Sequence, residues 1–171
     1  TQVSSYGLDV IKDMIYELLL EVLNEDGQDI KGIYERNDIK IRAKEGLSLE
    51  KGFWRNAHLP TTTIINENGI LLHVDVENGQ KTGYFLDQKA NRVLLRKMAH
   101  GKKVLDCFSH TGGFALNAAY GKAKEVHAVD VSQTALNQAY ENAKLNHLEN
   151  KMRFIKDDVF DYLDKCKVGQ Y

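Results

Sequence analysis

The chain has 171 residues, a length that suits one domain or two small ones, and its hydrophobic fraction of 43% supports a packed core. A formal net charge of −1 excludes a globally basic nucleic-acid-binding protein but leaves room for a local basic face. The two cysteines, Cys107 and Cys166, form no CxxC pair, which argues against a zinc motif or a disulfide framework. Without a signal peptide or an apolar run of ~20 residues, we expect a cytoplasmic location and no membrane contact.

The first half of the chain predicts a small α+β domain over residues 1–83. Apolar residues at helical spacing predict a helix over residues 8–23, and the clearest hairpin has Asn68 and Gly69 at its turn. The remaining expected elements are strands over residues 29–36, 39–42, 61–65 and 70–76. Arg42, Lys44 and Lys51 form a basic cluster, which we interpret either as a solvated face or as a phosphate contact.

Residues 84–171 predict an α/β unit with a doubly wound, Rossmann-like parallel sheet, because strand and helix patterns alternate as βαβαβα. Asp87 is expected to cap the first helix and Ser132 a later one. The expected helices cover residues 87–99, 114–120, 133–145 and 159–166, and the expected strands cover residues 103–106, 125–129 and 152–156.

The organising stretch is residues 103–119, where an apolar strand ends at Asp106 and a glycine-containing turn leads into a helix. Gly112 and Gly113 lack a Cβ, so they can adopt positive φ and let a ligand approach the backbone. The alternative is a connecting turn without a ligand. Asp130 also ends an apolar strand, and it follows Asp106 at close to the ~20-residue offset of a ribose-binding acid.

The strand-end acids favour a cationic nucleoside ligand. The turn lacks the G-x-G-x-x-G pattern of dinucleotide sites, and an acid at the first strand end would repel a pyrophosphate. S-adenosyl-L-methionine offers three matching donors: an ammonium for Asp106, ribose hydroxyls for Asp130 and an adenine amine for Asp158. The neighbouring Asp157 is expected to face water.

Several segments together resemble the bacterial 23S rRNA cytosine-C5 methyltransferases of the large-subunit methyltransferase I type. The resemblance covers nearly the whole chain, with two departures: Lys89 stands where that family often has arginine, and His110 where it often has tyrosine. The matching segments are residues 33–38, 42–46, 82–92, 104–114, 129–132 and 156–160.

The resemblance implies which residues hold S-adenosyl-L-methionine. The methionine part would lie against Phe108, Ser109, Gly112 and Gly113, with Gln88 and Arg92 as candidates for its carboxylate; the alternative for Arg92 is a solvated helix charge. The ribose and adenine would be flanked by Asp130, Val131, Asp158 and Val159.

The resemblance also implies a catalytic cysteine that follows an Asp-Pro-Pro segment, and this chain has neither in that place. The single proline is Pro60, and we interpret Cys107 and Cys166 as small buried apolar residues. We therefore expect a fragment that carries no catalytic residue and is inactive alone. We expect an exposed strand edge to favour self-association as a homodimer.

Two other functions stay open at this point. The front domain could serve as a non-catalytic module that binds ribosomal RNA or assists assembly. The second half could instead belong to a nicotinamide-dependent oxidoreductase, although the missing glycines argue against it.

Overall fold

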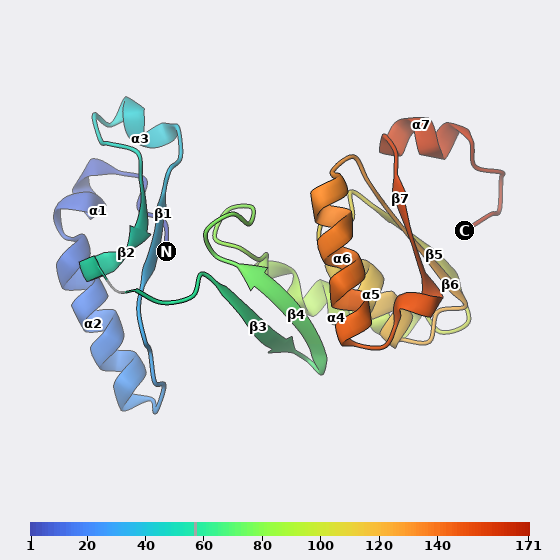
Figure 1. Cartoon of the computed structure of the whole chain (residues 1–171), viewed down its shortest axis with the longest axis horizontal. Helices are drawn as coiled ribbons and strands as arrows, with labels where there is room; N and C mark the ends of the chain where they lie inside the picture. The colour runs from blue at the N-terminus through green and yellow to red at the C-terminus, as the bar shows by residue number, and fades with distance from the viewer. Residues whose placement is uncertain (57) are drawn as a thin grey trace. The chain divides into compact units, whose positions relative to one another are not determined.

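The computed structural model describes residues 1–56 and 58–171, and the chain is traced in Figure 1. It forms two compact units, each of which is described by itself. The first unit comprises residues 1–63 and 74–84, and the second comprises residues 64–73 and 85–171. The tip of the hairpin, within residues 64–73, thus belongs to the second unit, whereas we expected it in a first domain of residues 1–83. Within the described residues, no helix has the length and apolar character needed to cross a membrane.

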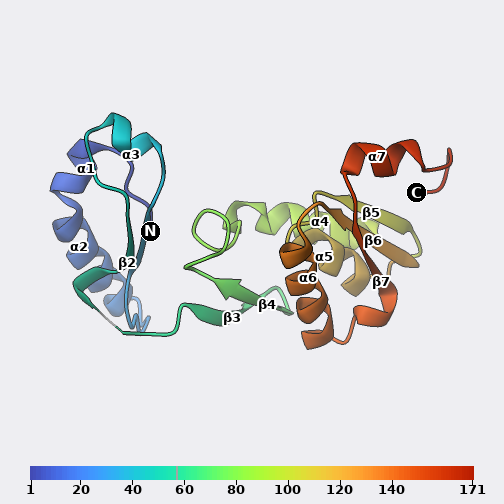
Figure 2. The same ribbon diagram turned by 45° about the horizontal axis from the view of Figure 1, so that its top comes forward.

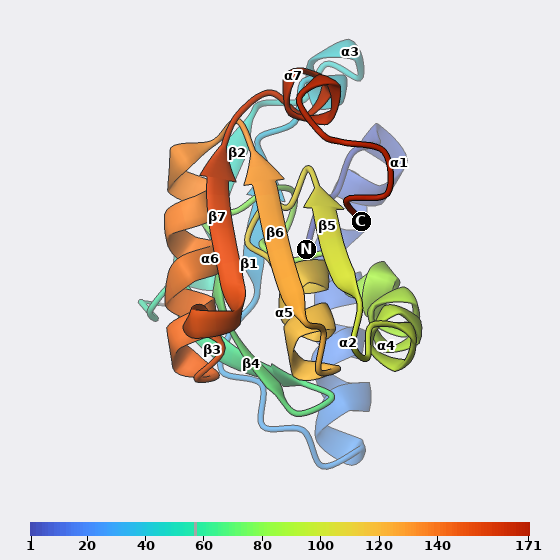
Figure 3. The ribbon, with the colours of Figure 1, turned by 90° about the vertical axis from the view of Figure 1, so that its right-hand side faces the viewer.

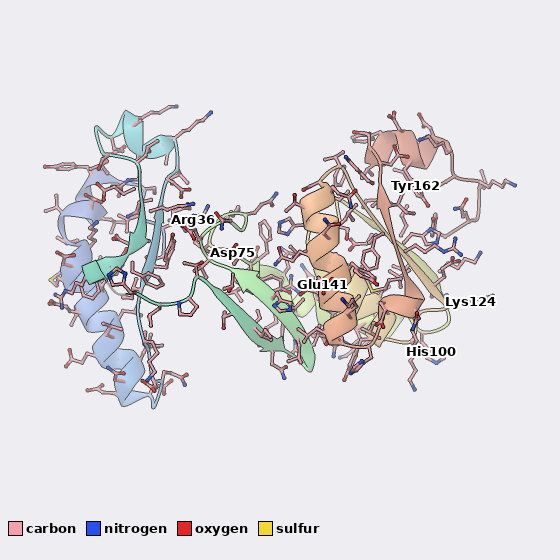
Figure 4. The ribbon with its side chains drawn as sticks, viewed as in Figure 1. Arg36, Asp75, His100, Lys124, Glu141 and Tyr162 are labelled. Carbon is pink, nitrogen blue, oxygen red and sulfur yellow. The ribbon has the colours of Figure 1, made fainter. Side chains whose placement is uncertain are left out.

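The first unit is a small α+β arrangement around a helix and a two-stranded antiparallel sheet. Its elements are α1 (Tyr6–Val10), α2 (Lys12–Glu25), β1 (Tyr34–Asn37), α3 (Ile41–Lys44), β2 (Glu50–Phe53) and the 3₁₀ turn η1 (Trp54–Asn56). Val3, Tyr16 and Ile33 form its apolar core, and the Tyr16 ring meets Trp54 edge to face. The side chain of Arg36, labelled in Figure 4, donates from β1 to the carbonyls of Val76 and Gly79 at 3.2 and 2.7 Å.

Two expectations for this unit are wrong in detail. Residues 39–42 do not form a strand, because Ile41 begins the short helix α3. Arg42 is 1% exposed, and its guanidinium donates to the carbonyls of Val3 and Ser48 and to the carboxylate of Asp9. A buried arginine with these partners holds loops together, so it is not part of a basic surface cluster.

The rest of the unit shows smaller differences from the expected pattern. The first strand begins at Tyr34, later than the residue 29 expected from the sequence. Lys51 Nζ lies 3.9 Å from the carboxylate oxygen Oε1 of Glu77, whereas the Lys44 side chain is exposed. What was expected to be a basic cluster is therefore one buried arginine, one paired lysine and one solvated lysine.

The second unit contains a parallel three-stranded sheet in the order β5-β6-β7, as the sequence predicted. The strands are β5 (Lys103–Cys107), β6 (Glu125–Asp130) and β7 (Met152–Lys156), and all three arrows point the same way in Figure 3. The helices are α4 (Lys89–Met98), α5 (Gly113–Tyr120), α6 (Gln133–Leu145) and α7 (Val159–Asp164), with 3₁₀ turns η2 (Leu86–Gln88) and η3 (Glu149–Lys151).

Helices α5 and α6 lie against the same face of this sheet (Figures 2 and 3). Small side chains allow the close approach: α5 buries Ala115, Ala118 and Ala119, and the facing strand β6 buries Val126 and Ala128. The first turns of both helices lie beside the carboxyl ends of β5 and β6, which is where an open α/β sheet binds its ligand.

The predicted hairpin consists of β3 (Thr62–Glu67) and β4 (Ile70–Asp75), with positive φ at Asn68 and Gly69. Its tip carries one half of a buried ion pair. Arg92 of α4 donates through Nε and Nη2 to the two carboxylate oxygens of Glu67, each at 2.7 Å. Both side chains are at most 5% exposed. This geometry fixes α4 to the hairpin tip.

Of the two predicted helix caps, the structure contains the one at Ser132 but not the one at Asp87. Ser132 caps α6 as expected, because its Oγ accepts from the backbone N–H of Ala135 at 3.2 Å. Asp87 does not cap α4, which begins at Lys89 after the turn η2. The Asp87 carboxylate instead accepts from the side-chain amide of Gln88 at 3.0 Å.

Candidate functional site

The acids singled out in the sequence gather at the carboxyl edge of the parallel sheet. Asp106 is the penultimate residue of β5, Asp130 is the last residue of β6, and Asp158 follows β7 by two positions. Because the strands are parallel and in register, their carboxyl ends meet at one edge. The acids therefore lie at the same edge of the sheet, and their role in ligand binding stays a prediction.

The turn from β5 to α5 is held tightly by backbone hydrogen bonds. Ser109 N–H donates to the Val129 carbonyl at 3.0 Å, and Gly112 N–H donates to the Ser109 carbonyl at 2.9 Å. Phe108 and His110 both adopt positive φ, at 57° and 50°. Left-handed conformations at non-glycine residues carry strain and concentrate at ligand sites, so this turn has the character of a binding loop.

Of the two glycines, only Gly112 has the positive φ that we expected, at 81°. Gly113 is the first helical residue of α5. A Cβ built on Gly112 would lie 3.0 Å from the Cβ of Ala139 on α6. Gly112 is therefore required both by its backbone conformation and by the close approach of α6.

Replacement of Gly112 by alanine is expected to lower the free energy of unfolding by more than the about 1–2 kcal/mol that left-handed backbone costs at a residue with a Cβ, because the new Cβ would also crowd Ala139. Chemical denaturation of both proteins measures this difference. Gly101→Ala is the matched control, because Gly101 also has positive φ but a Cβ there meets nothing within 4 Å. Equal losses at both positions would show that the contact with Ala139 adds nothing.

Asp106 is the most strongly perturbed carboxyl group of the site. Burial raises its pKa to about 6, although the hydrogen bond that it accepts from Ala115 N–H at 2.9 Å opposes this shift. A carboxylate that is poorly solvated in this way gains from a cation placed beside it.

Asp130 organises the backbone on both sides of it. One carboxylate oxygen accepts from His110 N–H and the other from Ser132 N–H, both at 2.8 Å. A carboxylate has about four acceptor positions, so Asp130 retains the capacity to accept two more hydrogen bonds. It can therefore shape the turn and receive ligand hydroxyls at the same time.

The acids after β7 differ from what we expected. Asp157, expected to face water, is half-buried and pairs with Lys165 at 2.7 Å. Asp158 is the exposed residue, and it caps α7 by accepting from Phe160 N–H at 2.8 Å. Both capping bonds, from Phe160 N–H and Asp161 N–H, end at the same carboxylate oxygen, Oδ1.

Exposed apolar side chains flank the acids. Phe108 is 61% exposed and Val131 is 59% exposed. Phe160, which the sequence analysis did not single out, is 68% exposed, and its ring centroid lies 6.0 Å from that of Phe108. Val159 is 2% exposed, so its side chain belongs to the core and only its backbone can border a ligand.

Ser109 supplies a buried hydroxyl. The residue is 6% exposed, and its Oγ has no hydrogen-bond partner that meets geometric criteria among the described residues. The hydroxyl nevertheless interacts with the Asp106 carboxylate closely enough to oppose the rise of the Asp106 pKa, so Ser109 and Asp106 form one polar group at the turn.

The two candidates for a ligand carboxylate, Gln88 and Arg92, both make hydrogen bonds to other side chains of the protein. Gln88 Oε1 accepts from Asn91 at 2.9 Å, next to the bond that it donates to Asp87. Arg92 is 2% exposed, so its interpretation as a solvated helix charge is wrong. A ligand carboxylate would have to displace Glu67 from the guanidinium of Arg92.

The cysteines lack the features of an activated nucleophile. Both are half-buried. Burial and the nearby Asp106 raise the pKa of the Cys107 thiol, and the Cys166 thiol donates to the Tyr162 carbonyl at 3.3 Å. The described residues hold no His, Cys, Asp and Glu grouping suited to a metal ion.

The second unit is a parallel α/β sheet with acidic residues at its carboxyl edge, which is where such sheets bind their ligands. Residues 50–171 match the family model of the S-adenosylmethionine-dependent methyltransferases. The chain belongs to this family, and the predicted cofactor, S-adenosyl-L-methionine, is the one that the family uses.

Two curated proteins of the same name are similar to most of this chain. The "Ribosomal RNA large subunit methyltransferase I" of Aeromonas salmonicida is 42% identical over 163 residues, which cover 95% of this chain and 40% of that protein. The protein of the same name from Erwinia tasmaniensis is 48% identical over 136 residues, 79% of this chain and 34% of its own length. The chain thus spans well under half the length of these curated relatives.

A crystal structure described as a methyltransferase complexed with SAH superposes with a TM-score of 0.78 at 30% identity, covering 95% of this chain and 40% of the other. The predicted family and fold class are therefore confirmed. The nicotinamide-dependent alternative is set aside, because the family uses a different cofactor.

Proposed function

We propose that this chain binds S-adenosyl-L-methionine at the carboxyl edge of β5-β6-β7. The observation that carries the proposal is the set of Asp106, Asp130 and Asp158 around a strained glycine turn. The buried hydroxyl of Ser109 beside Asp106 and the close backbone at Gly112 fit a ligand that presents polar groups to this turn.

Each residue has a role that follows from its chemistry. Asp106 faces the ammonium, Asp130 accepts from the ribose hydroxyls, and Asp158 accepts from the adenine amine. Phe108 lies against the methionine part, and Val131 flanks the ribose and adenine. The bound cofactor supplies a methyl group activated by a sulfonium centre, and these residues hold and orient it.

We further propose ribosomal RNA as the substrate class, with C5 of a cytosine in 23S rRNA as the target, in the cytoplasm. The name shared by the relatives and the resemblance of the motifs support this. C5 methylation needs a thiolate nucleophile, and neither Cys107 nor Cys166 is activated for that role. The chain then acts as the cofactor-binding part of the reaction and is inactive alone.

Methyl transfer from labelled S-adenosyl-L-methionine to undermethylated ribosomal RNA tests this proposal. We expect no turnover by this chain alone, together with retained cofactor binding. Turnover that Cys107→Ser or Cys166→Ser abolishes would contradict the assignment of both cysteines. Tight, salt-sensitive RNA binding without cofactor binding would favour the RNA-binding or assembly module instead.

Self-association also stays a prediction. β5 is an edge strand of the described sheet, and unpaired strand edges invite pairing with another chain. Sedimentation at high concentration tests it, and a monomer throughout would count against a homodimer.

The raised pKa of Asp106 gives a pH prediction. Without ligand, folding is favoured by the protonated acid, so stability falls as pH rises from the ordinary value of 3.8 to about 6. A ligand ammonium favours the ionised carboxylate. We therefore expect S-adenosylhomocysteine (SAH) to bind more tightly at pH 7.5 than at pH 5 and to release protons on binding near pH 6. Calorimetry in buffers of different ionisation enthalpy measures this release, and Asp106→Asn should remove it.

A further inference from the structure

Helix α6 carries two asparagines, one turn apart, that bind the outer edge of β4. Asn142 Oδ1 accepts from His73 N–H at 2.8 Å, and Asn146 Oδ1 accepts from Leu71 N–H at 2.9 Å. The spacing matches, because four helical residues rise about 6 Å and two strand residues about 6.6 Å. Both asparagines therefore satisfy strand N–H groups that β3 does not reach.

The two amides differ in what their nitrogen atoms do. Asn146 Nδ2 donates to the carbonyls of Leu71 and Asn142, each at 2.7 Å. Asn142 Nδ2 donates at 3.1 Å to the carbonyl of Thr111, in the turn between β5 and α5. One fully buried side chain thus joins the hairpin strand to the candidate cofactor turn.

The bond to the Thr111 carbonyl holds the second half of the turn from outside, in addition to the bond from Gly112 N–H to the Ser109 carbonyl within the turn. The front of the turn is fixed through Ser109 and His110, which bind the end of β6. The rear of the turn, at Thr111 and Gly112, meets α6 instead, through Asn142 and through the close contact with Ala139. Without the Asn142 amide, the Thr111 carbonyl would lose this partner, and the peptide between Thr111 and Gly112 would be held by its N–H bond to Ser109 alone.

We propose that Asn142 is a positioning residue that sets the cofactor turn against the hairpin, so that cofactor affinity depends on it although it does not touch the cofactor. The proposal rests on the cofactor site proposed above. In this role, Asn142 couples the conformation of β4 to cofactor binding at the turn. The coupling acts in both directions, because a ligand that orders either element favours the same arrangement of the other.

The experiment compares Asn142→Ala with Asn146→Ala in the full chain. Each variant leaves one backbone N–H of β4 without its side-chain acceptor and removes one buried or half-buried side-chain amide. Only Asn142→Ala also removes the donor to the Thr111 carbonyl. Calorimetric titration with SAH gives Kd, and thermal unfolding gives the loss of stability. We expect Asn142→Ala to raise the Kd on the order of tenfold, the effect of about one lost hydrogen bond, and Asn146→Ala to leave it within about threefold.

A second readout needs no ligand. Hydrogen exchange of the Gly112 amide should accelerate in Asn142→Ala and not in Asn146→Ala, and Asn142→Asp, which keeps the acceptor for His73, should behave like Asn142→Ala. Equal effects of the alanine variants on Kd and on exchange would overturn the proposal and leave Asn142 a purely structural residue. If the wild-type chain binds no SAH, the cofactor site fails, while the exchange result still decides whether Asn142 orders the turn.

Discussion

Replacement of Asp130 by alanine is expected to raise the Kd for SAH by about 100-fold or more. The substitution removes the carboxylate that faces the ribose hydroxyls and also frees the N–H groups of His110 and Ser132, which shape the turn. Hydrogen bonds to a charged group contribute about 1.5–3 kcal/mol each, and each 1.4 kcal/mol is a factor of ten in affinity. Isothermal titration of folded wild-type and variant proteins measures the change.

Asp157→Ala is the matched control for this prediction. Asp157 is also an acid beyond a strand end, but its carboxylate is paired with Lys165 at 2.7 Å, and that lysine is 64% exposed. Such a surface ion pair contributes little, so affinity should change by less than about threefold. If both variants bound SAH as the wild type does, Asp130 would have only a structural role.

Replacement of Arg92 by alanine is expected to lower the free energy of unfolding by about 3–5 kcal/mol. The substitution leaves the Glu67 carboxylate buried without the bidentate partner that lies 2.7 Å away, and an uncompensated buried charge carries that cost. Equilibrium denaturation followed by circular dichroism measures the loss. The sequence alone made Arg92 a ligand candidate, so this experiment separates a packing role from a binding role.

The double variant Glu67→Leu/Arg92→Met provides the control. Replacing both partners with apolar groups of similar volume leaves no unpaired charge, so stability should recover most of the loss seen in Arg92→Ala. A different pattern would contradict the structural assignment: unchanged stability in Arg92→Ala together with lost SAH binding. That result would instead assign Arg92 to binding of the cofactor carboxylate.

The sequence predicted the sheet of the second unit well because its signals are local and mutually consistent. Apolar runs that end in acids predicted β5, β6 and β7, and Ser132 marked the start of α6. The first unit was harder to predict. Alternation over residues 39–42 looked like a strand, but Arg42 is held in the interior by distant partners such as Val3 and Asp9, which no local pattern reveals.

For the candidate site too, the sequence predicts what depends on local signals and misses what depends on distant contacts. The acids Asp106 and Asp130 could be found from strand ends and spacing, and the structure brings them to one edge. The burial of Arg92 depends on Glu67, 25 positions away in the hairpin, and the role proposed for Asn142 depends on contacts with β4 and the turn. Phe160 directly follows Val159, yet only the fold shows that it is the exposed residue of the two.

We propose that this acidic edge selects S-adenosyl-L-methionine over a dinucleotide. Calorimetric titration of the chain with SAH, with NAD under the same conditions, tests this most directly. We predict saturable binding of SAH and none of NAD, because the turn offers carboxylates to an ammonium and no glycine cradle to a pyrophosphate. Binding of NAD with no binding of SAH would contradict the account.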